Sequence, residues 1–221
     1  MCVLKLKKKG IIGIDLAGKP ENPTGWAFLL GKNVKTGVIY ANDEILEFIV
    51  RNSPALVAID APFSLPKAGL LRKADKEMIK RGYRVFPPNL PSMRALTLRA
   101  MKLNKLIAQS GYKTIEVHPT STRKALNMPT SDLEAIQGIL KNMGMKGDIE
   151  ARPLTVHEID AVTAALTGYL YTKNKTESVG DVKEGCITVP KRCDWKALKF
   201  ERDGKTSESC RNGDCRRVPA R

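Results

Sequence analysis

Residues 11–18 read IIGIDLAG, an apolar run that ends at Asp15 and is followed by Gly18. The run predicts a short strand that is buried on both faces. Burying a carboxylate without a partner is costly, so an aspartate at the end of such a strand indicates a functional group. The stretch therefore predicts a central strand and one residue of a site.

Two later stretches follow the same pattern. Residues 56–60 read LVAID and end at Asp60, and residues 115–119 read IEVHP, which contains Glu116. In one sheet, three such strands would gather carboxylates along one edge, as divalent-metal sites require. Each acid also has a simpler explanation on its own. An aspartate after a strand often serves as a turn residue or helix cap, and Glu116 is open to pairing with arginine or lysine.

The remaining sequence pattern predicts the order of strands and helices along the chain. Residues 24–30 and 34–40 are predicted strands that form a hairpin around a tight turn. Helices are predicted at residues 43–51, 71–81, 92–110, 119–126, 131–143 and 155–171, a strand at 113–117, and a short strand is an option at 185–190. A hairpin followed by alternating helices and strands predicts an α/β fold, with a mixed sheet and helices on both faces. This order matches the ribonuclease H-like fold with a five-stranded sheet.

The last helix carries two candidate site residues. Thr155 and Glu158 have the spacing of a capping box, which explains Glu158 without a role in a metal site. His157 and Asp160 are three residues apart and share one helix face. Small residues at positions 161, 164 and 168 would let this face approach the sheet and bring His157 and Asp160 toward Asp15. Taken alone, His157 is also explained by a local hydrogen bond near the helix start.

Four acids form the predicted metal site: Asp15, Asp60, Glu116 and Asp160. Two Mg²⁺ (or Mn²⁺) ions held about 4 Å apart by such carboxylates activate water and stabilise the leaving oxygen of a phosphodiester. The predicted catalytic residues are Asp15, Asp60, Asp160 and His157. We expect His157 to orient the attacking water, move a proton or join the metal ligands.

The formal net charge of +15 favours a polyanionic partner, most simply nucleic acid. A lysine-rich surface of the kind found in heat-adapted proteins is the alternative explanation. Arg72, Arg99 and Lys124 are the predicted phosphate contacts. Because there is no apolar run of about 20 residues and no secretion signal, we expect a cytoplasmic protein without a membrane partner.

Residues 1–190 are predicted to form the folded domain and residues 191–221 a mobile basic tail. Such a tail would add sequence-independent affinity for nucleic acid. The five cysteines are an odd number, which argues against a disulfide framework. Cys193, Cys210 and Cys215 are conceivable zinc ligands, but their spacing fits no usual structural zinc pattern.

The sequence resembles domain-of-unknown-function family 429 over about residues 10–190. The matching segments are GIDLAG at 13–18, TGWA at 24–27, AIDAP at 58–62, Arg72 with AD at 74–75, EVHP at 116–119, HEIDA at 157–161 and the ending at 179–190. Members are described as predicted nucleases of ribonuclease H-like fold. The acids also resemble the pattern of Holliday-junction resolvases of the RuvC type, in which Asp15, Asp60 and the pair His157/Asp160 have counterparts. Glu116 has no clear counterpart there.

The resemblance implies a metal-dependent nuclease that acts on DNA or RNA. A junction-cleaving enzyme would be a two-fold homodimer, since two symmetric strands are cut. Two alternatives stay open. One is a nucleic-acid-binding module of the same fold without catalysis. The other is an actin-like or sugar-kinase-like enzyme, in which a similar Gly-x-Asp-x-x-Gly strand end binds nucleotide phosphates, although the chain has no second copy of the domain.

Overall fold

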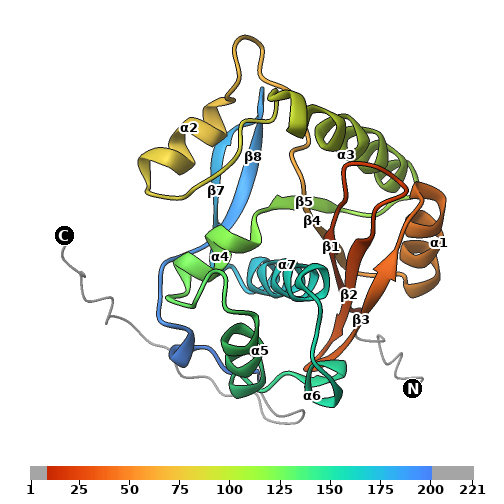
Figure 1. Ribbon diagram of the computed structural model, residues 1–221, viewed down its shortest axis with the longest axis vertical. Coiled ribbons are helices and arrows are strands. Elements are labelled where there is room, and N and C mark those ends of the chain that lie inside the picture. Colours follow the sequence, from red (N-terminus) through yellow and green to blue (C-terminus); the bar gives the residue numbers. More distant parts are fainter. Residues whose placement is uncertain (1–8, 201–221) are drawn as a thin grey trace, which may run out of the picture.

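The computed structural model describes residues 9–200, and within them eight strands form one sheet in the order β6-β3-β2-β1-β4-β5-β8-β7 (Figure 1). The strands are β1 (Ile11–Asp15), β2 (Thr24–Leu30), β3 (Asn33–Ile39), β4 (Leu56–Asp60), β5 (Thr114–Val117), β6 (Lys146–Gly147), β7 (Thr176–Asp181) and β8 (Gly185–Pro190). β2 is antiparallel to both β1 and β3, whereas β4 is parallel to β1 and to β5. The central order β3-β2-β1-β4-β5, with these directions, is the ribonuclease H-like arrangement and confirms the predicted fold class.

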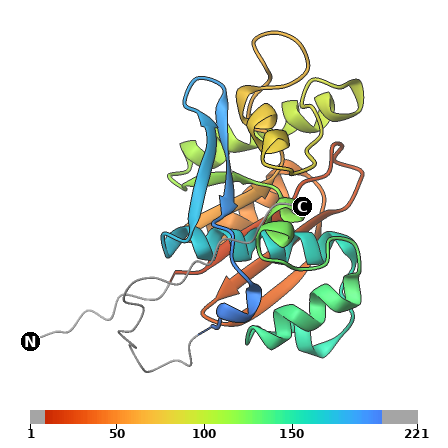
Figure 2. The same cartoon turned by 90° about the vertical axis from the view of Figure 1, so that its left-hand side faces the viewer.

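The sheet is larger than the five strands predicted. β6 pairs two residues with the outer edge of β3, and the β7–β8 hairpin extends the sheet beyond β5. Residues 176–181 read TESVGD, and only Val179 among them is buried, which explains why no apolar pattern predicts β7. In Figure 2 this hairpin stands beside α2. Val179 and Ile187 pack there against Met78 of α2.

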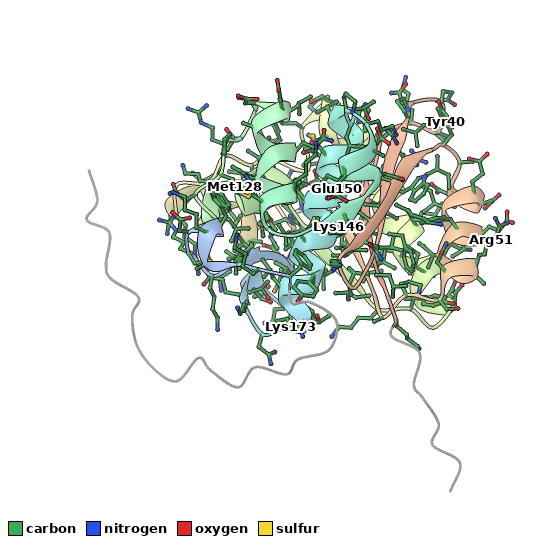
Figure 3. The ribbon with its side chains drawn as sticks, turned by 90° about the horizontal axis from the view of Figure 1, so that it is seen from below. Tyr40, Arg51, Met128, Lys146, Glu150 and Lys173 are labelled. Atoms are coloured by element: carbon green, nitrogen blue, oxygen red, sulfur yellow. The ribbon has the colours of Figure 1, made fainter. Side chains whose placement is uncertain are left out.

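Helices cover both faces of the sheet. They are α1 (Asn42–Asn52), α2 (Lys73–Lys80), α3 (Pro91–Gln109), α4 (Pro119–Ala125), α5 (Leu133–Asn142), α6 (Asp148–Ala151) and α7 (Val156–Thr172), with a short 3-10 helix at Trp195–Ala197. α1 and α3 pack on one face, and α7 with α4, α5 and α6 covers the other. Figure 3 shows Arg51 of α1 and Glu150 of α6 on opposite sides of β2 and β3.

Alternation along β1 decides which side chains meet which helices. Ile12 and Ile14 belong to the apolar cluster of α1 and α3, whereas Ile11 belongs to the cluster of α7. Since successive side chains in a strand point to opposite faces, Gly13 and Asp15 share the face of Ile11. Asp15 therefore points toward α7.

Glycine allows α7 to lie unusually close to the sheet. A Cβ atom at Gly13 would stand 2.0 Å from the carbonyl oxygen of Ala161, and one at Gly168 would stand 2.6 Å from Ile11. A Cβ atom at Gly25 of β2 would meet the carbonyl oxygen of His157 at 2.1 Å. The close approach of α7 therefore depends on glycines in the strands as well as on the small residues predicted on the helix.

The first part of the predicted tail packs on the domain. Trp195 donates a backbone hydrogen bond to the carbonyl of Leu126, and Phe200 donates one to Met143. Leu198 and Phe200 are buried in the apolar cluster of α7. The larger part of the predicted tail, residues 201–221, lies outside the described residues, as do Cys2, Cys210 and Cys215. None of the helices within residues 9–200 is long and apolar enough to cross a membrane.

Helix starts agree with the prediction only in part. The capping box of Thr155 and Glu158 is present at the start of α7. The helix predicted from residue 131 begins at Leu133, after its cap Asp132, which accepts a hydrogen bond from the backbone of Ala135. The helix predicted from residue 43 begins one residue earlier, at Asn42, with Ala41 as its cap. Ala41 has no side-chain acceptor, and its backbone N–H instead donates to the Glu44 carboxylate in the first turn of α1.

Candidate active site

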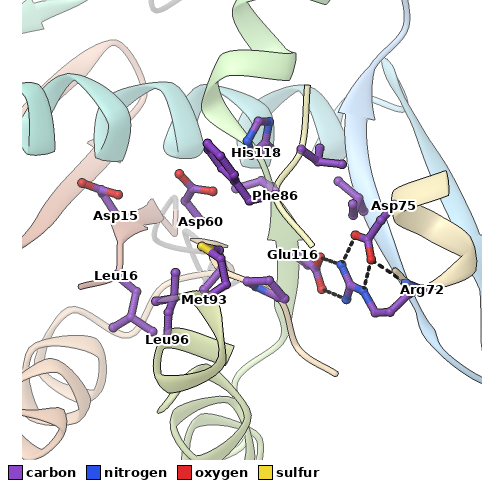
Figure 4. A pocket seen from close by; sticks show the side chains of 15 residues that line it. Asp15, Leu16, Asp60, Arg72, Asp75, Phe86, Met93, Leu96, Glu116 and His118 are labelled. Atoms are coloured by element: carbon purple, nitrogen blue, oxygen red, sulfur yellow. Dashed lines mark hydrogen bonds and ion pairs between the residues drawn. The ribbon is translucent and has the colours of Figure 1, made fainter. Parts of the chain in front are cut away.

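Asp15 and Asp60 are direct partners in the parallel ladder between β1 and β4. Their neighbours Ile14 and Ile59 both face α1 and α3, so the two aspartates lie on the opposite face, under α7. Neighbouring strands are about 4.8 Å apart, which places the carboxylates side by side. Figure 4 shows both side chains at one cavity of about 220 Å³.

Burial and neighbouring carboxylates disfavour the charged forms of both Asp15 and Asp60. Burial raises the pKa of Asp60 well above its ordinary value, and the charges of Asp15 and Asp160 raise it further. Within residues 9–200, Asp60 has no hydrogen-bond partner to compensate. The pKa of Asp15 is raised to about 6, mainly by burial, against the lowering effect of its hydrogen bond to His157. A cation between these groups would relieve both the repulsion and the burial cost.

His157 holds Asp15 from the first turn of α7. Its Nδ1 atom lies 2.8 Å from Oδ2 of Asp15. The His157 side chain is 40% exposed and the Asp15 side chain 19%, so the imidazole lies between the buried carboxylate and solvent. The turn itself is fixed, because Glu158 accepts hydrogen bonds from the backbone of Thr155 and from Arg152. The structure thus brings together Asp15 and His157, as the sequence predicted.

Asp160 lies one helical turn further along α7 and forms an ion pair with Arg123 of α4. The Arg123 side chain is only 4% exposed, and its Nη1 and Nη2 atoms also lie within hydrogen-bonding reach of Thr163 and Thr120. The charge of Arg123 lowers the pKa of both Asp15 and Asp60. Sequence reasoning missed Arg123 and selected its neighbour Lys124. Adjacent residues of a helix point about 100° apart, and nothing in the sequence shows which of the two faces the carboxylates.

Glu116 has a different role from the predicted metal ligand. In the β4–β5 ladder it pairs with Ile59, not with Asp60, so it takes the face opposite to the two aspartates. Arg72 donates to its two oxygens at 2.6 and 2.9 Å, and the backbone of Phe63 donates at 2.8 Å. These bonds occupy the carboxylate, and Figure 4 shows the pair among the side chains that line the cavity. Glu116 therefore has an arginine partner, the second of the two explanations given by the sequence. The proposed metal site does not include it.

Two of the three expected phosphate contacts are buried. Arg72 is fully buried and also forms an ion pair with Asp75 at 2.8 Å. Arg99 is 8% exposed and donates to Asn42 and to the carbonyls of Ala17, Lys19 and Tyr40, which fastens the loop after β1. Both guanidinium groups are thus committed to the fold.

Lys124, the third expected phosphate contact, is exposed and donates to the carbonyl of Gly82 at 2.6 Å. An ammonium group has three donors, so this bond leaves others for a ligand.

His118 lines the cavity and, after Arg123, is the second residue that the sequence did not single out for the site. It caps α4, and its Nδ1 atom accepts a hydrogen bond from the backbone of Ser121 at 3.3 Å. Burial, with a contribution from Arg123, lowers its pKa to about 4. His118 is therefore neutral at pH 7, with its proton on Nε2. The sequence signal for His118 was its position directly before Pro119, at the start of a predicted helix.

The donor set suits a hard divalent cation, although it is small. Among the residues that the structure describes, no group of three or more Asp, Glu, His or Cys side chains is arranged to hold a metal ion. Mg²⁺ commonly binds through one or two carboxylates and keeps several waters. Asp60 and the Oδ1 atom of Asp15 meet this requirement, since neither has a hydrogen bond within residues 9–200. The residues present therefore fit one hydrated Mg²⁺ or Mn²⁺.

The fold and the placement of the acids define a protein of the ribonuclease H-like class. The family model described as "Protein of unknown function (DUF429)" matches residues 13–184, so the chain belongs to this family. No curated protein matches the sequence.

Solved structures with a similar chain path include two of RuvC from Thermus thermophilus. One is in complex with a Holliday junction substrate, with 16% identity and a TM-score of 0.48. The other has 17% identity and a TM-score of 0.45. Each comparison covers 75% of this chain and 96% of the other. The order and directions of the strands define the ribonuclease H-like fold of this chain.

Proposed function

We propose that the protein is a divalent-metal-dependent nuclease that hydrolyses phosphodiester bonds in nucleic acid. The observation that carries this proposal is the in-register pair of Asp15 and Asp60, whose carboxylates share one cavity and both have a raised pKa. A protein that needed the pair only for its fold would give Asp60 a hydrogen-bond donor. A pair without one is suited to a cation that arrives with the substrate or before it.

Bound Mg²⁺ or Mn²⁺ would activate water and stabilise charge on the phosphoryl oxygens. Asp15 and Asp60 would hold the ion, while Asp160 adds negative charge from α7. His157 directs Nδ1 toward Asp15. In the neutral ring with the proton on Nδ1, Nε2 is left as a proton acceptor. His157 therefore accepts a proton from water at Nε2, and Asp15 stabilises the imidazolium that results.

The charge of the chain supports a nucleic-acid substrate. A formal net charge of +15 raises the local concentration of a polyanion. Lys124 is an exposed cation on α4, the helix that also carries Arg123, and is the proposed phosphate contact. The predicted cytoplasmic location, and the homodimer that a four-way junction would require, stay predictions.

The test is cleavage of labelled single-stranded DNA, duplex DNA, four-way junction, single-stranded RNA and RNA–DNA hybrid with Mg²⁺ or Mn²⁺. Wild type is compared with Asp15→Asn and Asp60→Asn. Asp43→Asn is the matched control, since Asp43 is exposed on α1. We expect both site variants to lose at least about a hundredfold in rate, a loss typical of removing one electrostatic contributor. Asp43→Asn should cleave like wild type.

Two results contradict the proposal. Equal rates in wild type and in both site variants would place the activity elsewhere or in a contaminant. Binding of the nucleic acids without cleavage of any of them would favour the non-catalytic binding module.

A further inference from the structure

Arg123 is a buried cation among the proposed site's carboxylates. It forms an ion pair with Asp160, and its charge lowers the pKa of both Asp15 and Asp60. The guanidinium is held from α7 by Asp160 and Thr163 and from its own helix by Thr120. Arg123 thus lies where its positive charge acts on all three aspartates.

The position of Arg123 is not explained by the fold alone. Its Nε atom is buried and has no hydrogen-bond partner within residues 9–200. Leaving such a donor unpaired costs on the order of 1–3 kcal/mol. A guanidinium retained at this cost, against a carboxylate on the site helix, indicates that its charge is used.

The balance of charge indicates how many divalent ions the site binds. Asp15, Asp60 and Asp160 carry three negative charges when ionised, and Arg123 supplies one positive charge. One divalent ion brings the group to neutrality, whereas a second would leave two positive charges in a partly buried place. The cost of burying unbalanced charge opposes the second ion. In addition, Arg123 already binds the Oδ1 atom of Asp160.

We propose that Arg123 takes the place of a second metal ion, so that the site binds one divalent cation at Asp15 and Asp60. This inference rests on the proposed function and differs from the two-ion site predicted from the sequence. Arg123 is a positioning residue here: its ion pair neutralises Asp160 and places a fixed positive charge beside the two aspartates that hold the single ion. Its fixed charge also compensates part of the phosphate charge.

Counting Mn²⁺ ions per chain tests the inference without reference to activity. Electron paramagnetic resonance of free Mn²⁺ during titration gives the number bound to wild type, Arg123→Lys and Arg123→Gln. We expect one ion for wild type and one for Arg123→Lys, which keeps the charge. Arg123→Gln frees Asp160, and we expect it to bind two ions. Circular dichroism is the check that each variant is folded. The number of ions bound to wild type tests the inference even if neither variant folds.

The possible failures are distinct. Two ions bound to wild type would overturn the role of Arg123 while leaving the proposed metal-dependent nuclease intact. One ion bound to a folded Arg123→Gln would likewise overturn it, because the charge would not be what excludes the second ion. No Mn²⁺ bound to wild type would overturn the metal site itself and the inference with it.

Discussion

Asp15 and Asp60 are paired residues of neighbouring parallel strands, and both carboxylates lie on the sheet face that α7 covers. The relationship follows from the alternation of side chains in β1 and β4, which run in register from Ile11 and Leu56. Because the pair is set by the backbone of two central strands, its geometry does not depend on a mobile loop. A site built on such strands is well positioned before any ligand binds.

Stability should depend on pH through Asp15. Its pKa is raised from 3.8 to about 6 in the folded protein, so the folded state holds this proton between about pH 4 and 6 when the unfolded chain has lost it. The contribution of Asp15 is therefore fully present at low pH and is lost as pH rises through 6. The free energy of unfolding of Asp15→Asn minus that of wild type should rise by roughly 2–3 kcal/mol from pH 4 to pH 7. Urea unfolding at both pH values measures this gain, and a constant difference would contradict the raised pKa.

Glu116 should matter for stability and not for metal affinity. Glu116→Gln leaves Arg72 buried with only Asp75 as a carboxylate partner. Breaking a buried ion pair costs about 3–5 kcal/mol, so thermal unfolding should occur at a clearly lower temperature. Mn²⁺ affinity of the folded variant should stay near that of wild type. The opposite outcome, full stability with metal binding lost, would restore Glu116 to the metal site.

Gly13→Ala should disturb the approach of α7 to the sheet. The new methyl group would stand 2.0 Å from the carbonyl oxygen of Ala161, so the helix must shift. Overpacking of this kind costs about 1–3 kcal/mol or more, and it should also lengthen the distance from His157 to Asp15. Gly138→Ala on α5 is the control, because nothing lies within 4 Å of its added methyl group. Chemical denaturation of both variants measures the difference, and equal stability would contradict the packing.

Nucleic-acid affinity should fall steeply with salt. With a net charge of +15, binding is expected to release counterions from the phosphates. Six to ten phosphate contacts would lower affinity by about 10³–10⁵ between 50 and 200 mM salt. Fluorescence anisotropy with a labelled oligonucleotide at several salt concentrations gives the slope. An affinity that does not change with salt would indicate that the charge only reflects a lysine-rich surface.

The central strands and the last helix were predictable from sequence because their signals are local. The apolar runs before Asp15 and Asp60 define strands, and the capping box at Thr155 defines the start of α7. The spacing of His157 and Asp160 follows from the helix period alone. These local features sufficed for the fold class and for the grouping of Asp15 with His157.

The remaining errors concern which way a side chain points. Glu116 lies one residue before the end of β5, whereas the two aspartates end their strands, and the register of β5 against β4 turns it to the other face. Arg72 and Arg99 look like surface cations in sequence, and only the tertiary structure shows the carboxylates and carbonyls they bind. Arg123 was missed for the same reason. Register and long-range pairing are set by the assembled sheet, which a single sequence does not reveal.

The affinity of Mn²⁺ for wild type, Asp60→Asn and Asp43→Asn tests the central claim most directly. Isothermal titration calorimetry at pH 7 measures it without a substrate. The two variants remove the same charge, one in the cavity and one on the exposed surface of α1. We predict that Asp43→Asn binds like wild type and that Asp60→Asn binds at least about tenfold more weakly, a loss of about 1.4 kcal/mol. Equal affinity in all three proteins would contradict a metal site at Asp15 and Asp60.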